Sequence, residues 1–231
     1  MYYIEPKDAD SYLNSGIAHS EKGDHDKAIA DFNKAIEINP RLADAYNNRG
    51  NAYSDKDEHK KAIADFNKAI EINPRFAEAY NNRGNVYNNK GEFDKAIPDY
   101  TKAIEINPRL AEPYNGRANA FREKGEFNKA FADYNRAIEI NPRFAEAYNN
   151  RGTLYYMKGN LDRSLTDFNK AIEVNPRYVI PYGSRGLLYS RKRELDKALK
   201  DYETFLQLEP NHPSATQIRE KIKELKELLG E

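Results

Sequence analysis

An Asn-Pro dipeptide recurs every 34 residues in this chain of 231, and this interval constrains the fold more than any other feature. Its copies begin at Asn39, Asn73, Asn107, Asn141 and Asn175. Glu5-Pro6 and Glu209-Pro210 extend the series by one interval at each end. Such a period is typical of arrays in which each unit buries its apolar face against its neighbours. An elongated, thin core is therefore favoured over a compact one, which fits the low mean hydropathy of −0.95.

Each repeat carries two helical patterns. In one copy, Tyr80 and Gly84 lie one turn apart on the first pattern, and Ala96 and Tyr100 lie one turn apart on the second. Gly91 stands between the two patterns and suits a left-handed turn residue. We therefore expect two helices of about 12–14 residues in every repeat.

Small residues recur on both helices, and aromatic residues lie beside them. The small positions of the first helices are Gly16, Gly50, Gly84, Ala118, Gly152 and Gly186. Those of the second helices are Ala28, Ala62, Ala96, Ala130, Ser164 and Ala198, followed by Phe32, Phe66, Tyr100, Tyr134, Phe168 and Tyr202. Over residues 9–212 this pattern resembles the tetratricopeptide repeat family. The resemblance implies an all-α fold, a right-handed superhelical α-solenoid of six 34-residue helix-turn-helix repeats plus a C-terminal capping helix.

The repeat frame also predicts the domain organisation. Residues 1–8 are expected to be a remnant or lead-in of a preceding repeat. The six repeats are expected at 9–42, 43–76, 77–110, 111–144, 145–178 and 179–212, and the capping helix at 213–231. Asp57 and Arg193 occupy turn positions that are Gly in four other repeats, so these two turns are expected to be strained.

A regular set of charges accompanies the repeats. Asp31, Asp65, Asp99, Asp133, Asp167 and Asp201 lie on the second helices. Arg49, Arg83, Arg117, Arg151 and Arg185 lie on the first helices, and Arg219 stands in the same frame. A spacing of 18 residues pairs every Asp with an Arg of the following repeat. We therefore predict a ladder of partly buried ion pairs, Asp31 with Arg49 and so on, that joins successive repeats.

No motif predicts catalysis. The chain has no Cys, its four His lack metal-ligand spacing, and no Gly-rich phosphate loop occurs. We expect no enzyme activity, no metal and no cofactor. No stretch is long and apolar enough for a membrane span, and the first residues do not form a signal peptide, so a cytoplasmic location is expected.

The candidate site is the face of the first helices that the family uses as a peptide groove. Its predicted residues are Asn14, Asn47, Asn48, Asn51, Asn81, Asn82, Asn85, Asn115, Asn119, Asn149, Asn150, Glu78 and Glu112. Asn is a mediocre helix former, so its accumulation needs a reason. This row resembles the asparagine ladder in the repeats of O-linked N-acetylglucosamine transferases, which implies hydrogen bonding to an extended peptide backbone. The alternative is that duplication copied a neutral surface residue.

Charge indicates which peptide would fit. Groove positions hold acids such as Asp44, Glu78 and Glu112, so a neutral-to-basic peptide is favoured over the acidic C-termini that other members of the family bind. The sixth repeat differs, because Ile180 and Leu187 there would accept an apolar side chain or contact the cap.

The leading hypothesis is therefore a protein–protein interaction scaffold with an unidentified protein or peptide partner. A less favoured alternative is nucleic acid or an anionic surface, bound by the Arg that follows each repeated Pro: Arg41, Arg75, Arg109, Arg143 and Arg177. These cations are one repeat apart and lack free aromatic stacking platforms. Self-association into a homo-oligomer is a third hypothesis.

Overall fold

The computed structural model describes residues 8–230, which contain helices and no strand. The chain divides into two compact units, Met1–Lys124 and Gly125–Glu231. The first unit holds α1 (Ala9–Glu21), α2 (His25–Ile38), α3 (Ala43–Asp55), α4 (His59–Ile72), α5 (Ala77–Asn89), α6 (Phe93–Ile106) and α7 (Ala111–Glu123). The second holds α8 (Phe127–Ile140), α9 (Ala145–Met157), α10 (Leu161–Val174), α11 (Ile180–Arg191), α12 (Leu195–Leu208) and α13 (Ala215–Leu229). The predicted lead-in, residues 1–8, lies almost entirely outside the described residues.

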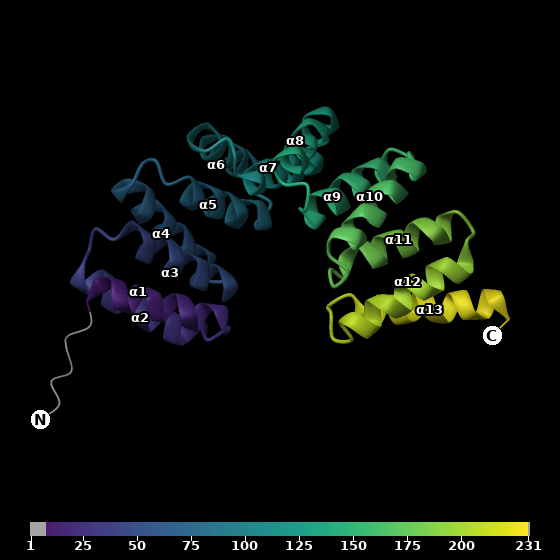
Figure 1. The fold of residues 1–231 in the computed structure, drawn as a ribbon, viewed down its shortest axis with the longest axis horizontal. Helices are drawn as coiled ribbons and strands as arrows, with labels where there is room; N and C mark the ends of the chain where they lie inside the picture. The colour runs from purple at the N-terminus through teal and green to yellow at the C-terminus, as the bar shows by residue number, and fades with distance from the viewer. Residues whose placement is uncertain (1–7, 231) are drawn as a thin grey trace, which may run out of the picture. The chain divides into compact units, whose positions relative to one another are not determined.

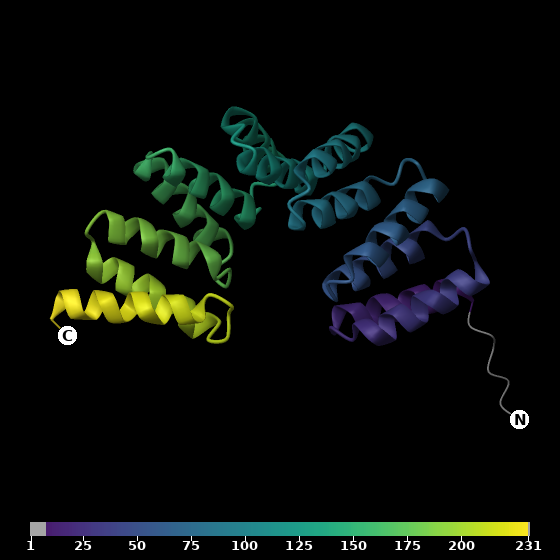
Figure 2. The ribbon, with the colours of Figure 1, turned by 180° about the vertical axis from the view of Figure 1, so that it is seen from behind.

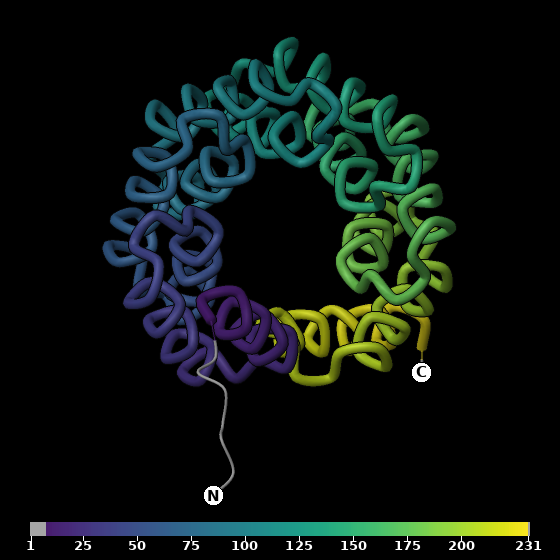
Figure 3. Tube along the Cα trace, turned by 60° about the vertical axis from the view of Figure 1, so that its left-hand side comes forward, coloured from purple at the N-terminus to yellow at the C-terminus, as the bar shows by residue number. Residues whose placement is uncertain are grey.

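Within each unit, consecutive helices form antiparallel pairs that lie side by side in Figures 1 and 2. In the first unit the pairs are α1 with α2, α3 with α4 and α5 with α6; in the second they are α9 with α10 and α11 with α12. The first helix of a pair also contacts the first helix of the next, as α3 does α5 and α9 does α11, so first helices form one of the two rows visible within each unit (Figure 3). The predicted all-α class is confirmed.

The two helices of a pair approach closely because glycine faces an aromatic ring. A Cβ atom added to Gly50 would lie 2.7 Å from the Phe66 ring, and one added to Gly84 would lie 2.9 Å from the Tyr100 ring. Both rings are fully buried. A larger residue would push the ring aside or separate the helices, so the small-and-aromatic pattern of the sequence sets the spacing of each pair.

The last helix covers the apolar side of the sixth pair. Ile218 and Leu225 of α13 are buried in a cluster with Tyr202 and Phe205 of α12. The figures show α13 beside α12 at the C-terminal end of the second unit. This contact removes from water an apolar surface that each earlier pair buries against its successor.

Two turns adopt a conformation that is costly for residues with a side chain. Asp57 has φ of 58° and Arg193 has φ of 62°, whereas the corresponding turns elsewhere contain Gly with positive φ. Each follows the end of a first helix, where a left-handed residue lets the chain reverse direction. The predicted strain is thereby placed at the two expected positions.

The predicted register of the ion-pair ladder is wrong. Arg83 donates to Asp99 of its own repeat through Nε (2.7 Å) and Nη2 (2.6 Å). Arg49 does the same to Asp65, and Arg151 and Arg185 do the same to Asp167 and Asp201. The spacing is therefore 16 residues rather than 18, since an antiparallel pair places those two positions opposite each other. The acidic partners are buried, as predicted.

The arginine still joins successive repeats, but through a different partner. Arg83 Nη1 donates to Oδ1 of Asn67 on the preceding second helix at 2.5 Å. Arg49 contacts Asn33 in the same way, and Arg117 contacts Thr101. Each guanidinium therefore links its own pair to the one before it. The hydrogen bonds to Asp99 raise the pKa of Arg83 above its usual value.

At the two ends of the array, Asp31 and Arg219 lack the regular ion-pair partner and form other hydrogen bonds. Ser15 replaces the arginine of the first repeat, and its hydroxyl donates to Asp31 Oδ2 at 2.6 Å. Arg219 donates instead to the Pro210 carbonyl oxygen at 2.8 Å. The predicted register assumed that every Asp pairs with an Arg. This assumption is wrong, because the Ser15 hydroxyl takes the place of an Arg in the first repeat.

Replacing Arg193 by Gly should stabilise the protein by about 0.5–1 kcal/mol, because Gly adopts positive φ without steric cost. Asp57→Gly should give a smaller gain, since Asp tolerates this conformation better than Arg. Urea unfolding followed by circular dichroism measures both changes. Lys192→Gly, one residue earlier in a right-handed conformation, is the control and should be destabilising; a loss of stability in Arg193→Gly would contradict the strain.

A double-mutant cycle on Arg83 and Asp99 should give a coupling of about 1–3 kcal/mol, because the pair is bidentate and largely buried. The exposed Lys102–Glu105 pair serves as the control and should couple by about 0.3–0.5 kcal/mol. If Arg83 coupled as strongly to Asp65 as to Asp99, the pairing within the repeat would be refuted.

Candidate functional site

Every first helix of the first unit begins with an exposed carboxylate. These residues stand at the second position of α1, α3, α5 and α7: Asp10, Asp44, Glu78 and Glu112. None of the four forms an ion pair among the described residues, although Arg41, Arg75 and Arg109 lie three residues before three of them. Acids in the first turn are favoured by the helix dipole. Their charge nevertheless remains free to act on a ligand.

Near the ends of the second helices, by contrast, the acidic side chains form ion pairs. Glu37, near the end of α2, pairs with Lys34 at 2.9 Å, and Glu71 pairs with Lys68 at 2.7 Å. The same pairing recurs at Glu105 with Lys102 and at Glu173 with Lys170. Negative charge is therefore neutralised locally along the second helices, whereas the starts of the first helices of the first unit keep theirs.

Three of the predicted groove asparagines are buried. Asn47, Asn115 and Asn149 are only 7%, 4% and 4% exposed. In the first unit, Asn82 Nδ2 donates to Asn47 Oδ1 at 3.1 Å, which connects α5 to α3. At this position, asparagine thus links neighbouring first helices, a role that the sequence analysis missed although it placed both residues on one face.

The other predicted asparagines are more accessible. Asn14 and Asn85 are exposed, and Asn48, Asn51, Asn81, Asn82, Asn119 and Asn150 are half-buried. Asn48 donates to the Asp44 carbonyl oxygen of its own helix, and Asn85 accepts from the Tyr100 hydroxyl at 2.8 Å. Glu78 and Glu112 are exposed. In the first unit, Asn14, Asn48, Asn51 and Asn81 are the asparagines of this set without a side-chain bond to another helix among the described residues, and Asn81 bonds only to Asn82 of its own helix.

The asparagine link between first helices is absent where the next first helix has no Asn at the position of Asn82. Asn149 Oδ1 is buried without a hydrogen-bond partner, and Ser184 on α11 stands where Asn82 stands on α5. Asn81 Oδ1 is also unpartnered, and Gly116 occupies the corresponding place on α7. Gly116 is needed there, because its Cβ would lie 2.5 Å from the Tyr100 ring.

The second unit presents apolar side chains on its first helices. Met157 of α9 is 55% exposed and Leu187 of α11 is 42% exposed. The Arg191 guanidinium lies 5.1 Å from the centre of the Tyr156 ring, so the C-terminal turns of these two helices adjoin. This is the region where an apolar binding position is predicted from the sequence.

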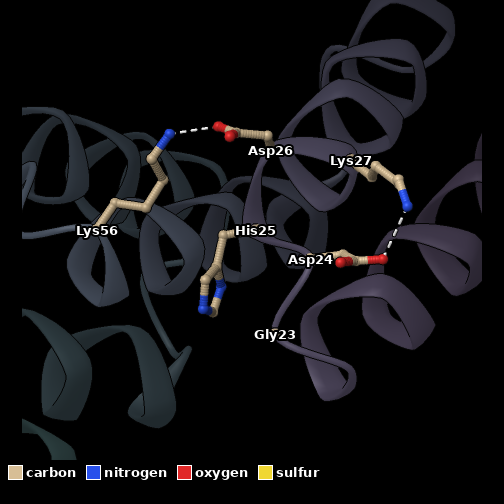
Figure 4. Close-up of a pocket in the computed structure, with 6 residues that line it drawn as sticks. All are labelled: Gly23, Asp24, His25, Asp26, Lys27 and Lys56. Carbon is tan, nitrogen blue, oxygen red and sulfur yellow. Dashed lines mark hydrogen bonds and ion pairs between the residues drawn. The ribbon is translucent and has the colours of Figure 1, made fainter.

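Shallow cavities recur at the turns between paired helices. One cavity of about 330 Å³ is lined by Gly23, Asp24, His25, Asp26, Lys27 and Lys56 (Figure 4). Lys27 pairs with Asp24 at 2.9 Å, and Lys56 pairs with Asp26. A similar cavity recurs around Gly91 and Lys124, so the feature follows from the repeat.

The ionisable groups of these turns are arranged in ion pairs. Hydrogen bonds from Lys90 and Lys95 lower the pKa of Glu92 to about 2, so this carboxyl is ionised at neutral pH and cannot act as a general acid there. Within residues 8–230, no group of three His, Cys, Asp or Glu is placed to hold a metal ion. None of the helices described is long and apolar enough to cross a membrane.

Comparison with solved structures shows the same helix-pair architecture. The chain is similar to MamA, with 30% sequence identity and a TM-score of 0.59 over 70% of this chain and 94% of that one. It is also similar to YrrB, described as a TPR protein with an unusual peptide-binding site, with 28% identity and a TM-score of 0.55 over 82% and 97% of the two chains.

A third structure, from the APC/C hetero-tetramer Cut9–Hcn1, has a TM-score of 0.85 at 17% identity and shows the shared fold alone. The match covers 96% of this chain but only 44% of that one, so the chain spans less than half of that relative's length. No curated protein matches the sequence.

Models of known families match most of the chain. A TPR repeat model matches residues 20–57 and 118–159. Tetratricopeptide repeat models match 43–76, 77–110, 145–178 and 181–212. With the helix pairs, the glycine–aromatic contacts and the 34-residue period, these matches show that the chain belongs to the tetratricopeptide repeat family.

Proposed function

We propose that this chain is a non-enzymatic scaffold that binds an extended, neutral-to-basic segment of another protein along the first helices of the first unit. The observation that carries this proposal is the row of four exposed, unpaired carboxylates, one at the start of each first helix. A peptide with Lys or Arg at intervals would find complementary charges there. Family membership supports an interaction role at a coarser level.

Accessible amides supply the second element of the site. The side chains of Asn14, Asn48 and Asn51 can each donate and accept hydrogen bonds without disturbing a neighbouring helix. Such groups suit a peptide backbone, which offers both donors and acceptors whatever its sequence. Asn47 is instead assigned to the contact with Asn82 of the next first helix, and the buried Asn115 is left out of the site.

The nucleic-acid alternative has weaker support. Arg41, Arg75 and Arg109 are exposed, but single-stranded nucleic acid also needs rings on which bases can stack. The ring of Tyr46 lies against the Arg49 guanidinium at 5.4 Å, and Tyr80 packs on Arg83 in the same way at 5.5 Å. These rings are therefore already occupied on one face.

Replacing Glu78 and Glu112 together by Lys should invert the charge preference of the first unit. The probes are two twelve-residue Gly/Ser peptides, one with four spaced Lys and one with four spaced Glu, followed by fluorescence anisotropy at 20 mM and 150 mM NaCl. The native chain should prefer the Lys peptide by roughly tenfold at low salt, with a smaller preference at higher salt. The double variant should prefer the Glu peptide. Glu71→Lys on a second helix is the control, and an equal effect there would refute a specific groove.

Replacing Asn14, Asn48 and Asn51 by Ala should weaken the Lys peptide by about 0.5–1.5 kcal/mol per lost hydrogen bond while leaving the unfolding midpoint nearly unchanged. Asn47→Ala is the matched control, because it removes the acceptor of Asn82 and should reduce stability more than binding. Undiminished binding by the triple variant would indicate that these asparagines do not contact the peptide and are only a surface residue copied by duplication.

A further inference from the structure

The first helices of the second unit differ from those of the first in the residues that end them. The thirteenth helix position is Glu21 in α1, Asp55 in α3, Asn89 in α5 and Glu123 in α7, but Met157 in α9. The corresponding residue of α11 is Arg191. A polar and mostly acidic helix end is thus replaced by an apolar one and a cationic one.

The charges at this place are uncompensated. Arg191, Lys158 and Arg193 are exposed, and none of them forms an ion pair among the described residues. Glu146 lies at the opposite end of α9, about 16 Å away along the helix. Burial raises the pKa of the Tyr202 hydroxyl, and Glu224 of α13 lies near enough to add to this rise, but it forms no ion pair with Arg191. The helix dipole favours cations at a C-terminus but does not require an exposed methionine beside them.

Leu187 appears at a position where the first unit uses asparagine. In the third repeat, Asn85 accepts a hydrogen bond from the Tyr100 hydroxyl at 2.8 Å. In the sixth repeat, Leu187 replaces that asparagine, and the buried Tyr202 hydroxyl has the Ser190 hydroxyl as its neighbour instead of an amide. The adjacent Ser190 hydroxyl donates to the Gly186 carbonyl oxygen at 3.0 Å. The sixth repeat thus exposes an apolar side chain where the third repeat has an amide, and this change is unfavourable for the protein alone.

We propose that Met157, Leu187, Tyr156 and Arg191 form a docking site for a peptide segment that carries a large apolar side chain next to a carboxylate. The apolar side chain contacts Met157 and Leu187, and the carboxylate pairs with Arg191. Methionine suits such a surface because its flexible side chain adapts to ligand shape. This inference rests on the proposed function in using first helices as the binding surface, but it assigns the opposite charge preference to a different surface.

The composition of the chain provides a direct probe. Its two methionines are Met1 and Met157, so methyl-¹³C-methionine labelling of the full chain gives two methyl signals, and Met157→Leu assigns them. The ligands are three ten-residue Gly/Ser peptides, acetylated and amidated, that carry Phe-Asp, Phe-Lys or Ala-Asp at the centre. Phe-Asp should shift the Met157 methyl saturably. The other two should bind roughly tenfold more weakly.

Two variants use residues that the chain itself tolerates at the same positions. Arg191→Glu introduces the residue found at Glu123 and should reverse the preference between Phe-Asp and Phe-Lys. Leu187→Asn introduces the residue found at Asn85 and should weaken Phe-Asp roughly tenfold. Ile38→Asn, at an apolar residue of α2 that is 51% exposed, is the control and should change neither.

Three outcomes would overturn the inference: a Met157 methyl that responds to none of the peptides, equal responses to Phe-Asp and Phe-Lys, and a shift on dilution of the protein alone. The last would show that a second copy of the chain covers the surface. Loss of Lys-peptide binding to the first unit with an intact Met157 response would reject the proposed groove and leave this site standing.

Discussion

The contact between a glycine on one helix and an aromatic ring on the next sets the geometry of five of the six repeats. Gly84 faces Tyr100 so closely that a Cβ would lie 2.9 Å from the ring. At this separation, the other residues of the two helices meet at fixed positions. The Arg83 guanidinium can then reach Asp99 with two nitrogens and still extend a third to Asn67. The polar network therefore depends on a packing contact that carries no charge.

Because this network is buried, it limits which substitutions a repeat tolerates at the Asp and Arg positions. A buried carboxylate without a cation or hydroxyl costs several kcal/mol, so each Asp needs a donor at the opposite position. The first repeat satisfies this need with Ser15, which donates to Asp31. Repeats can therefore exchange one donor for another, but cannot leave the position apolar while the Asp remains. This constraint explains why the interior changes little while the first-helix faces differ.

Much of the fold follows from the sequence because its signals repeat. The helix pairs, their turns and the left-handed Asp57 and Arg193 are all predicted from one 34-residue pattern. The register of the ion pairs could not be predicted by counting, because spacings of 16 and 18 residues both match an Arg to nearly every Asp. Only the crossing of two antiparallel helices decides between them.

The candidate site was predicted less completely, for a related reason. A helical face about 100° wide includes residues that touch the next helix as well as residues that face water. Asn47 and Asn48 are neighbours on that face, yet Asn47 is buried against α5 and Asn48 is accessible. The difference depends on how closely α3 and α5 approach, which a single repeat does not reveal. The carboxylates at the helix starts and the apolar Met157 lie away from that contact, so their exposure followed from the pattern alone.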